Sequence, residues 1–467
     1  MEAPNIILIT IDCLRADHLG CYGYSRDVSP NIDRLASKGA LFLEAISNGG
    51  RTPTSFPSIM ASQLPPLDWE EHRQIMQRVT NLAGVLKSAG YQTAAFLSNP
   101  FLTKYSHYDN GFDAFEDDLG IMSNQILRKS KGSPLRKNKV LGKIKILLGK
   151  ILDIALFCTG KQRDATADKL TGRSASWLKT CSGSFFLWTH FMDAHYPYLP
   201  PSQYVHQLYS RGISKRRIFN LYYRRLKSLR IADFRNAEWL SQAEIDTLID
   251  LYDANIRYID DSIGRLLDGL GSPLENTIII VTADHGEAFG EHNSLGHCTL
   301  YEELVHVPLI MVGPGIKAGT IVKEPVELMD LAPTIADLVG INSIKGFHGR
   351  SLLPVMRGGQ GMTEGTIVTN LIPESGQRLI SYRTPNWKYI RTESLDKANA
   401  LLSEEVYDLR NDPQERHNLH GTEDEKARAF EQKAIDKLQG FKQLKSEEKT
   451  AYEKERIRAR LKRLPKL

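Results

Sequence analysis

Two apolar segments of this chain are each followed by side chains of the kinds that bind metal ions. Asp12 lies just after the isoleucine-rich run 5–10, and Asp284 with His285 lies just after the run 276–282. Short apolar runs are typical of strands buried on both faces of a parallel sheet. Because ligands of open α/β sheets bind beyond the carboxyl ends of strands, we expect these side chains to meet at one edge. The alternative for Asp12 is an ordinary turn or helix-cap aspartate.

Residues 47–62, SNGGRTPTSFPSIMAS, combine a glycine-rich loop with the start of a helix. Pro57 suits a first helical turn, which predicts that Ser55 or Thr54 lies at the helix N-terminus. Backbone N–H groups and the helix dipole attract an anion there, and a hydroxyl could attack the bound group. Ser55 and Thr54 are both candidates for this hydroxyl. The alternative is an ordinary N-cap.

Histidines follow a third predicted strand, residues 184–189. His190, Asp193 and His195 lie there beside aromatic residues and prolines, and His297 comes soon after the acidic segment at 284–287. A single histidine is often a satisfied core residue, but polar side chains grouped at a strand end indicate substrate binding or proton transfer.

The elements that must position these residues alternate along the chain. Strands are predicted at 5–10, 39–44, 90–97, 184–189, 276–282 and 307–312, with helices at 28–38, 81–89, 165–178 and 242–270. Strands that alternate with helices are typical of a parallel α/β sheet.

The composition narrows the class of protein. The chain has 467 residues, of which 41% are hydrophobic, and a net charge of +5. This charge does not demand a nucleic-acid partner. Basic helical inserts near 128–160 and 204–236 could meet an anionic surface or steer an anionic substrate. Five scattered cysteines, no signal peptide and no long uncharged apolar run lead us to expect a cytoplasmic protein. Nothing in the sequence indicates the oligomeric state.

Taken together, the chain resembles the sulfatase family of the alkaline phosphatase superfamily. The resemblance covers most of the chain, and its specificity lies in the order and distances of the segments NIILITIDCLRADHLGCYGY, TSFPSIMAS, HFMDAHYPYLPP, IIIVTADHGEAFGEH, GHCTLYEELVHVPLIMVGPG, VELMDLAPTIADLVGI, GRSLLPVMRG, RTPNWKYIRT and EVYDLRNDPQERHNL.

The resemblance implies a fold and a division of the chain. We expect a doubly wound, mostly parallel α/β domain at 1–345, a small antiparallel-sheet subdomain at 346–423 and a charged helical tail at 424–467.

It also implies roles for single residues. One divalent metal ion is expected to be held by Asp12, Asp284 and His285 together with Ser55. The resemblance implies calcium, and magnesium or manganese are the alternatives. Ser55, His195 and His297 are expected to be catalytic. From the residues themselves, and not from the resemblance, we expect Arg51, Thr54 and His190 to bind the substrate, a small anionic ester.

The sequence departs from the family pattern at the residues that handle sulfate. Cys13 stands where the family has a second acid, Ile59 stands where an arginine accompanies formylglycine formation, and the family's sulfate-binding lysine and histidine are missing around 98–100. The family points to a metal-dependent sulfate-ester hydrolase. An unmodified serine would suit a phosphate mono- or diester or a phosphonate, and a non-catalytic anion-binding relative is the third alternative.

Overall fold

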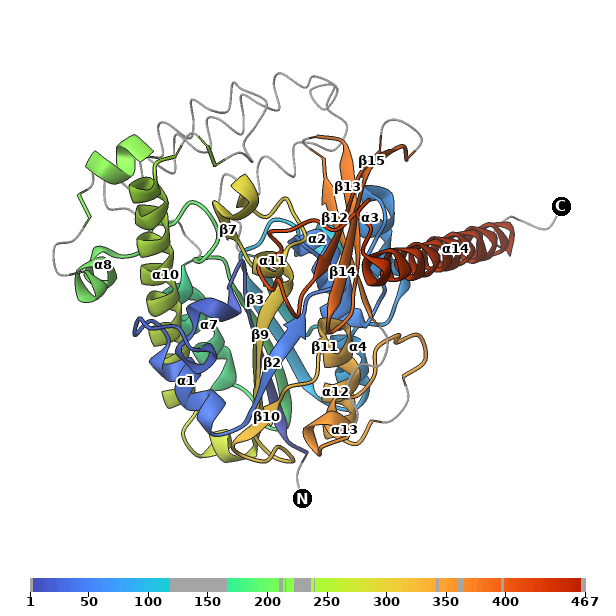
Figure 1. Cartoon of the computed structure of the whole chain (residues 1–467). Coiled ribbons are helices and arrows are strands. Elements are labelled where there is room, and N and C mark those ends of the chain that lie inside the picture. Colours follow the sequence, from blue (N-terminus) through green and yellow to red (C-terminus); the bar gives the residue numbers. More distant parts are fainter. Residues whose placement is uncertain are drawn as a thin grey trace, which may run out of the picture.

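A computed structural model describes residues 3–117, 166–209, 213–214, 216–221, 237–238, 240–341, 344–359, 365–373, 375–395 and 399–462 (Figure 1). The predicted basic insert near 128–160 lies outside the described residues, as does most of the second insert. In the part of the second insert that is described, a short helix, α8 (Ser202–Leu208), is present.

A mixed sheet of nine strands forms the centre of the molecule. The order is β10-β2-β9-β6-β1-β5-β3-β4, and β11 also pairs with β2. Among the described strands of this sheet, β9 alone runs antiparallel to its neighbours. The predicted mostly parallel sheet is therefore confirmed. The strands are β1 (Asn5–Ile11), β2 (Ala40–Ile46), β3 (Gln92–Leu97), β4 (Ala114–Asp117), β5 (Phe185–Phe191), β6 (Thr277–Ala283), β9 (His306–Val312), β10 (Thr320–Val322) and β11 (Val326–Glu327).

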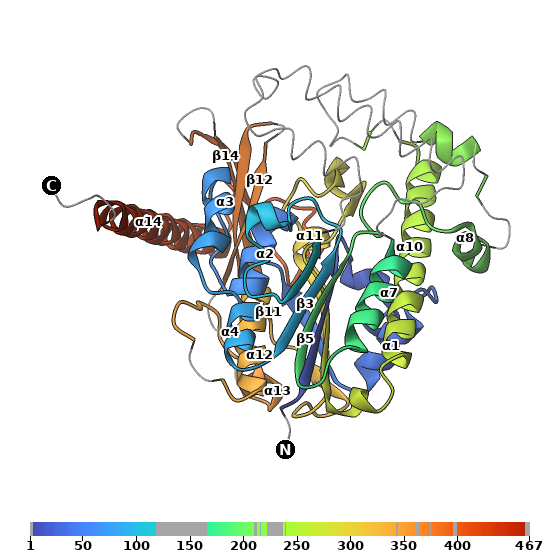
Figure 2. The same cartoon turned by 180° about the vertical axis from the view of Figure 1, so that it is seen from behind.

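Helices cover both faces of this sheet. Figures 1 and 2 show α1, α7 and α10 on one face and α2, α4 and α12 on the other. The longest of these, α10, begins at a capping box in which the Ser241 N–H donates to Glu244. The bounds are α1 (Pro30–Ser37), α2 (Thr52–Ala61), α3 (Trp69–Arg78), α4 (Leu82–Ser88), α7 (Ala167–Leu178), α10 (Gln242–Asp268), α11 (Glu302–Val305), α12 (Leu331–Leu338) and α13 (Leu353–Met356).

The register of the central strands places their carboxyl ends side by side. Ile11 of β1 lies opposite Ala283 of β6 and Phe191 of β5. The residues that follow Ile11 and Ala283 are Asp12 and Asp284, so the two carboxylates emerge next to each other. β5 in turn pairs with β3, where Leu97 lies opposite His190. One edge of the sheet therefore gathers side chains from four strands.

A second, smaller sheet packs against the first unit. It is an antiparallel meander of β12 (Thr366–Ile372), β13 (Gln377–Arg383), β14 (Trp387–Ser394) and β15 (Leu401–Asp408). One of its hydrophobic clusters joins it to residues such as Ile46, Leu300 and Leu304 of the large unit. This confirms the smaller C-terminal antiparallel-sheet domain.

The long helix α14 (Glu425–Lys462) covers part of the small sheet. Phe430 stacks on Tyr382 and Trp387, and Ala434 and Leu438 belong to the same buried cluster. The remainder of the helix extends away from the body of the molecule (Figure 1). Among the described residues, no helix is both long and apolar enough to cross a bilayer.

A small two-stranded hairpin lies close to the strand ends. It consists of β7 (Ala288–Phe289) and β8 (Leu295–Gly296). The hairpin follows the acidic segment at 284–287 and leads directly into His297, so its short turn brings His297 back to the same edge of the central sheet.

Candidate active site

The hydroxyl that reaches the strand ends belongs to Thr52. Helix α2 begins at Thr52, not at Ser55 or Thr54, so the predicted start of this helix is wrong by two or three residues. Thr52 donates to Asp12 Oδ2 at 3.3 Å. It also lies close enough to Asp284 to lower the pKa of that carboxyl. Ser55 is buried one turn further on, and its hydroxyl donates to the backbone oxygen of Thr52 at 3.3 Å.

Helix α2 contains two prolines, and the one expected to mark its start lies in its interior. Pro53 directly follows Thr52, while Pro57 lies inside the helix. A proline inside a helix has no N–H for the carbonyl four residues earlier, which here is Pro53. The buried His72 of α3 hydrogen-bonds to that carbonyl instead. Because tertiary structure supplies this partner, the helix continues through Pro57.

Asp12, Asp284 and His285 converge as predicted from their strands. His285 Nε2 lies 3.7 Å from Asp12 Oδ1 and 3.5 Å from Asp284 Oδ2. The other ring nitrogen of His285 donates to the Gly286 carbonyl at 2.8 Å, which leaves the lone pair on Nε2. Nε2 of His285 and Oδ2 of Asp284 are buried and have no hydrogen-bond partner in the described part of the chain. These residues therefore fit a cation between them.

The ionisation of the two carboxyl groups also favours a bound cation at this edge of the sheet. Burial opposes ionisation of Asp12, but the hydrogen bond with His190 and the charges of His195 and His285 hold its pKa well below the ordinary value. Burial, and then the charge of Asp12, raise the pKa of Asp284. The two carboxyls thus hold one negative charge readily and a second only beside a compensating cation.

Two side chains fix the orientation of Asp12. Asn99, just beyond β3, donates to Asp12 Oδ2 at 2.7 Å and to Thr52 Oγ1 at 3.3 Å. His190 Nε2 lies 3.3 Å from the same carboxylate oxygen.

A chain of donors sets the tautomer of His190. Trp188 Nε1 donates to Thr10 Oγ1 at 3.0 Å, and Thr10 Oγ1 lies 2.9 Å from His190 Nδ1. Since the indole can only donate, the Thr10 hydroxyl donates a hydrogen bond to Nδ1, and His190 therefore donates from Nε2. His190 is fully buried behind Asp12 and is placed to orient that carboxylate, not to bind substrate as predicted.

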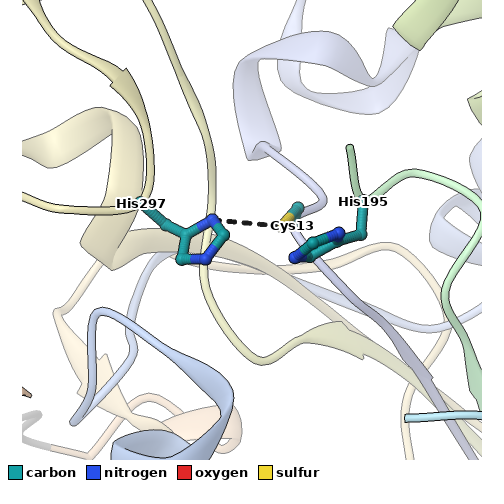
Figure 3. Close-up of side chains that lie close together, drawn as sticks. All are labelled: Cys13, His195 and His297. Carbon is teal, nitrogen blue, oxygen red and sulfur yellow. Dashed lines mark hydrogen bonds between the residues drawn. The ribbon is translucent and has the colours of Figure 1, made fainter. Parts of the chain in front are cut away.

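His195 and His297 lie on opposite sides of the Cys13 side chain. Figure 3 shows the Cys13 thiol between the two imidazoles. The ring centroids of His195 and His297 are 5.2 Å apart. His297 Nδ1 lies 3.9 Å from Cys13 Sγ and 3.3 Å from Glu287 Oε1. Burial lowers the pKa of His297 to about 4, although Glu287 opposes the shift, so this ring is neutral at pH 7.

Cys13 is held in an unusual backbone conformation. Its φ of 61° lies in the left-handed region, and Tyr252 supports the turn by donating to the Cys13 carbonyl at 2.7 Å. The thiol lies 3.1 Å from Asp12 Oδ1. Burial, and then the charge of Glu287, raise the pKa of Cys13 well above its ordinary value.

The remaining predicted residues support the backbone around the site. The Arg51 guanidinium donates to the His297 carbonyl at 3.2 Å and contacts Cys298 Sγ at 3.0 Å. Thr54 is fully buried, and its hydroxyl donates to the Arg51 carbonyl at 2.9 Å. Asp193 turns away and accepts a hydrogen bond from the Ala167 backbone.

Sequence reasoning missed Thr52 and Asn99. Pro53 is as good a signal of a helix start as Pro57, and it would have pointed to Thr52. Asn99 is the first long polar side chain after the β3 run, at the edge that Asp12 and Asp284 already marked.

A family model described as Sulfatase matches residues 4–341, and another described as N-sulphoglucosamine sulphohydrolase, C-terminal, matches residues 290–443. The chain belongs to the sulfatase family, and it is a hydrolase that acts on ester bonds.

Individual relatives agree with this assignment. Arylsulfatase K of Homo sapiens is 24% identical over 451 residues, covering 90% of this chain and 79% of that protein. A protein solved in complex with its substrate D-glucosamine-2-N,6-O-disulfate has a TM-score of 0.70 at 20% identity, covering 95% of this chain and 98% of that one. The phosphonate monoester hydrolase of Agrobacterium radiobacter has a TM-score of 0.69 at 21% identity, covering 94% and 96%.

Proposed function

We propose that this protein is a divalent-metal-dependent hydrolase of sulfate esters whose nucleophile is the hydroxyl of Thr52. The observation that carries the proposal is that Thr52 Oγ1 lies within 3.3 Å of Asp12 Oδ2, at the edge where Asp284 and His285 also emerge. Asp12, Asp284, His285 and Thr52 would hold the cation. When bound, a calcium, magnesium or manganese ion would lower the pKa of the attacking hydroxyl and neutralise charge on the transferred group.

Thr52 is the group that attacks the sulfur. Its proton is directed at Asp12 Oδ2, and Asn99 donates to the same hydroxyl oxygen, which fixes its direction. Thr52 Oγ1 gives up its proton and forms a bond to sulfur as the bond from sulfur to the leaving oxygen breaks, and that oxygen takes up the proton and leaves as the alcohol. Water then attacks sulfur, the bond from sulfur to Thr52 Oγ1 breaks, one proton of the water returns to Thr52, and sulfate is released.

His195 and His297 supply the polar groups for the oxygens of the transferred group. They stand on either side of Cys13, close to Asp12 and His285. Groups that are already oriented stabilise developing charge without reorganising during the reaction. Arg51 keeps the 297–298 segment in place, and His190 keeps Asp12 in place.

The substrate class follows from the family. The similarity to arylsulfatase K, the match to the C-terminal model of a sulphohydrolase and the likeness to a protein that binds a disulfated glucosamine support a small sulfated substrate.

A second candidate function is the hydrolysis of phosphate diesters or phosphonate monoesters. The observation that favours it is the threonine itself. Formylglycine is an aldehyde made from cysteine or serine, whereas oxidation of a threonine side chain gives a ketone. An unmodified hydroxyl that attacks a sulfate ester forms a stable alkyl sulfate. The same hydroxyl attacking a phosphate or phosphonate ester forms a phosphoryl ester that water hydrolyses readily. The likeness to a phosphonate monoester hydrolase agrees with this candidate.

Two variants test the nucleophile. Thr52→Val keeps the shape of the side chain and removes the hydroxyl, so turnover should fall at least about a thousandfold. Ser55→Ala, three residues on in the same helix, should stay within about tenfold of the wild type. Substantial activity in Thr52→Val, or its loss in Ser55→Ala alone, would return the role to Ser55.

A panel of substrates separates the two candidate functions. The full chain should be assayed on an aryl sulfate, a phosphate monoester, a phosphate diester and a phosphonate monoester with each divalent metal. We expect the aryl sulfate to have the highest kcat/KM, and a higher value for a phosphorus ester would establish the second candidate. Absence of turnover on every substrate would indicate an anion-binding relative without catalysis.

A further inference from the structure

Two aromatic rings lie close to the candidate active site and have no part in the reaction described so far. Thr52, Asp12 and Asp284 are buried, so the organic part of an ester bound at them must extend toward solvent. Phe101, just beyond β3, is 42% exposed, and its ring centroid lies 6.3 Å from that of the half-buried Trp69 of α3. Because single exposed apolar residues are common, the location of this pair decides whether it has a function.

One connection between Phe101 and the site runs through Asn99. The Asn99 amide donates to Asp12 Oδ2 at 2.7 Å and to Thr52 Oγ1 at 3.3 Å. Its oxygen, Oδ1, accepts from the Phe101 backbone N–H at 2.9 Å. One buried side chain thus joins the proposed nucleophile to the backbone of Phe101. The Sδ atom of the half-buried Met192 lies 3.1 Å from Asn99 Nδ2, so a second apolar side chain flanks the same amide.

A second connection runs through α3, which Figures 1 and 2 show beside α2. His72 hydrogen-bonds to the carbonyl of Pro53, the residue that follows Thr52. One turn earlier in α3, the Trp69 ring packs edge-on against His72, with the centroids 5.8 Å apart, and Trp69 in turn contacts Phe101. Both connections begin at the start of α2 and end at Phe101. The aromatic pair therefore adjoins the proposed nucleophile on the side of α3.

We propose that Phe101 and Trp69 form a subsite that stacks on a ring of the substrate's alcohol, so that the preferred ester is carried by an aromatic ring or a sugar ring. This inference deepens the proposed function and rests on it. Both kinds of ring present a flat apolar face to an aromatic side chain, whereas a flexible alkyl chain loses rotational freedom when it lies there. The hydrogen bond to Asn99 and the contact with Trp69 hold Phe101 in place before the substrate binds, which reduces the entropy lost on binding.

Phe101→Ala tests the subsite without disturbing the chemistry. The variant keeps the backbone N–H that donates to Asn99, so Asp12 and Thr52 keep their partner. The metal-loaded full chain should be assayed on nitrophenyl sulfate, a glucose sulfate and hexyl sulfate. We expect kcat/KM to fall about tenfold for at least one ring ester, mainly through KM, and less than about threefold for hexyl sulfate. The ring ester with the larger loss identifies the ring that the subsite prefers. An equal loss on all three esters, or no loss on either ring ester, would overturn the subsite.

Two further variants separate stacking from ordinary apolar contact. Phe101→Leu keeps an apolar side chain without a ring and should show most of the loss seen in Phe101→Ala. Tyr105→Ala is the matched control, because Tyr105 is a 67% exposed ring on the neighbouring turn η3 (Lys104–Ser106). It should leave the values for all three esters unchanged. A loss as large as that of Phe101→Ala would show that the contact with Asn99 does not single out Phe101, against the proposal.

Binding provides a readout that does not depend on turnover. A nitrophenyl group quenches the fluorescence of an indole that it contacts, so nitrophenyl sulfate should quench part of the tryptophan emission of the metal-loaded chain. Trp69→Phe should lose this part, and Phe101→Ala should need about tenfold more ligand to show it. Quenching without turnover would count against the proposed function and leave the subsite standing. Quenching that neither variant changes would overturn the subsite even in an active enzyme.

Discussion

Asp12 shows how a single residue acquires a function from its surroundings. It is fully buried, yet its pKa lies well below the ordinary value of an aspartate, because His190, His195 and His285 outweigh the effect of burial. Asn99 and His190 both hydrogen-bond to its Oδ2 atom. The other oxygen, Oδ1, faces Cys13 and His285. Asp12 is thus held by one oxygen and offers the other to a cation.

This arrangement predicts the effect of removing His190. His190→Leu fills the same buried space but cannot donate to Asp12, so the carboxylate loses one of the groups that orient it. Metal affinity should fall about 10–100-fold, as measured by calorimetric titration of the stripped full chain. His206→Gln, on the exposed side of α8, is the control and should leave the affinity unchanged. Equal affinities for wild type and His190→Leu would show that this hydrogen bond has no part in metal binding.

At the scale of elements, helix α2 depends on a partner from outside itself. Pro57 deprives the Pro53 carbonyl of its helical donor, and His72 of α3 replaces that donor. Thr52 lies at the end of this same helix. The position of the proposed nucleophile therefore depends on the contact between α2 and α3.

His72 should also make stability depend on pH. Burial lowers its pKa from 6.5 to about 4, so the unfolded chain takes up a proton between pH 6.5 and pH 4 that the folded chain refuses. The free energy of unfolding should therefore fall as the pH falls through this window, by up to about 3 kcal/mol. His72→Gln keeps a donor for Pro53 and removes the titration. Urea denaturation at pH 7.5 and pH 4.5 should show a smaller loss for the variant, and equal losses would contradict the role of His72.

At the scale of the whole molecule, buried charges join the small sheet to the large unit. Lys388 of β14 is fully buried, and its ammonium lies 2.8 Å from Glu302 Oε1 of α11 and 2.7 Å from Glu415 Oε1. Arg383 of β13 pairs with Glu302 from the other side at 3.1 Å. The helix α11 follows directly from the segment that contains His297. The small sheet therefore anchors the backbone that leads into the site.

Breaking this network should destabilise the protein strongly. Lys388→Met leaves the buried Glu415 without its cation, and we expect a loss of about 3–5 kcal/mol in the free energy of unfolding. Lys449→Met, whose side chain is 53% exposed in the wild type, is the control and should change stability by less than about 0.5 kcal/mol. Urea denaturation of the two variants checks this. A small effect in Lys388→Met would mean that the carboxyl groups take up protons and remain buried without the lysine.

Much of this architecture could be predicted locally. The apolar runs that became β1, β5 and β6 are short, rich in branched or aromatic residues and followed directly by polar side chains, and each of these features is readable within about ten residues. The convergence of Asp12 and Asp284 followed from the rule that ligands bind at the carboxyl ends of strands. The local sequence offered two possible starts of α2, because Pro53 and Pro57 are equal signals, and the contact with His72 of another helix lets α2 run through Pro57.

The amino-acid sequence by itself determined the α/β class, the membership of the sulfatase family and the acids and imidazoles at three strand ends. Only the tertiary structure decided that Thr52, not Ser55, reaches those acids, that His190 lies behind Asp12 and that Cys13 stands between His195 and His297. The physical reason is distance along the chain. Cys13 and His297 are brought together by the register of β1 and β6 and by the return of the hairpin β7–β8. No local pattern records such contacts, because they depend on how distant elements pack.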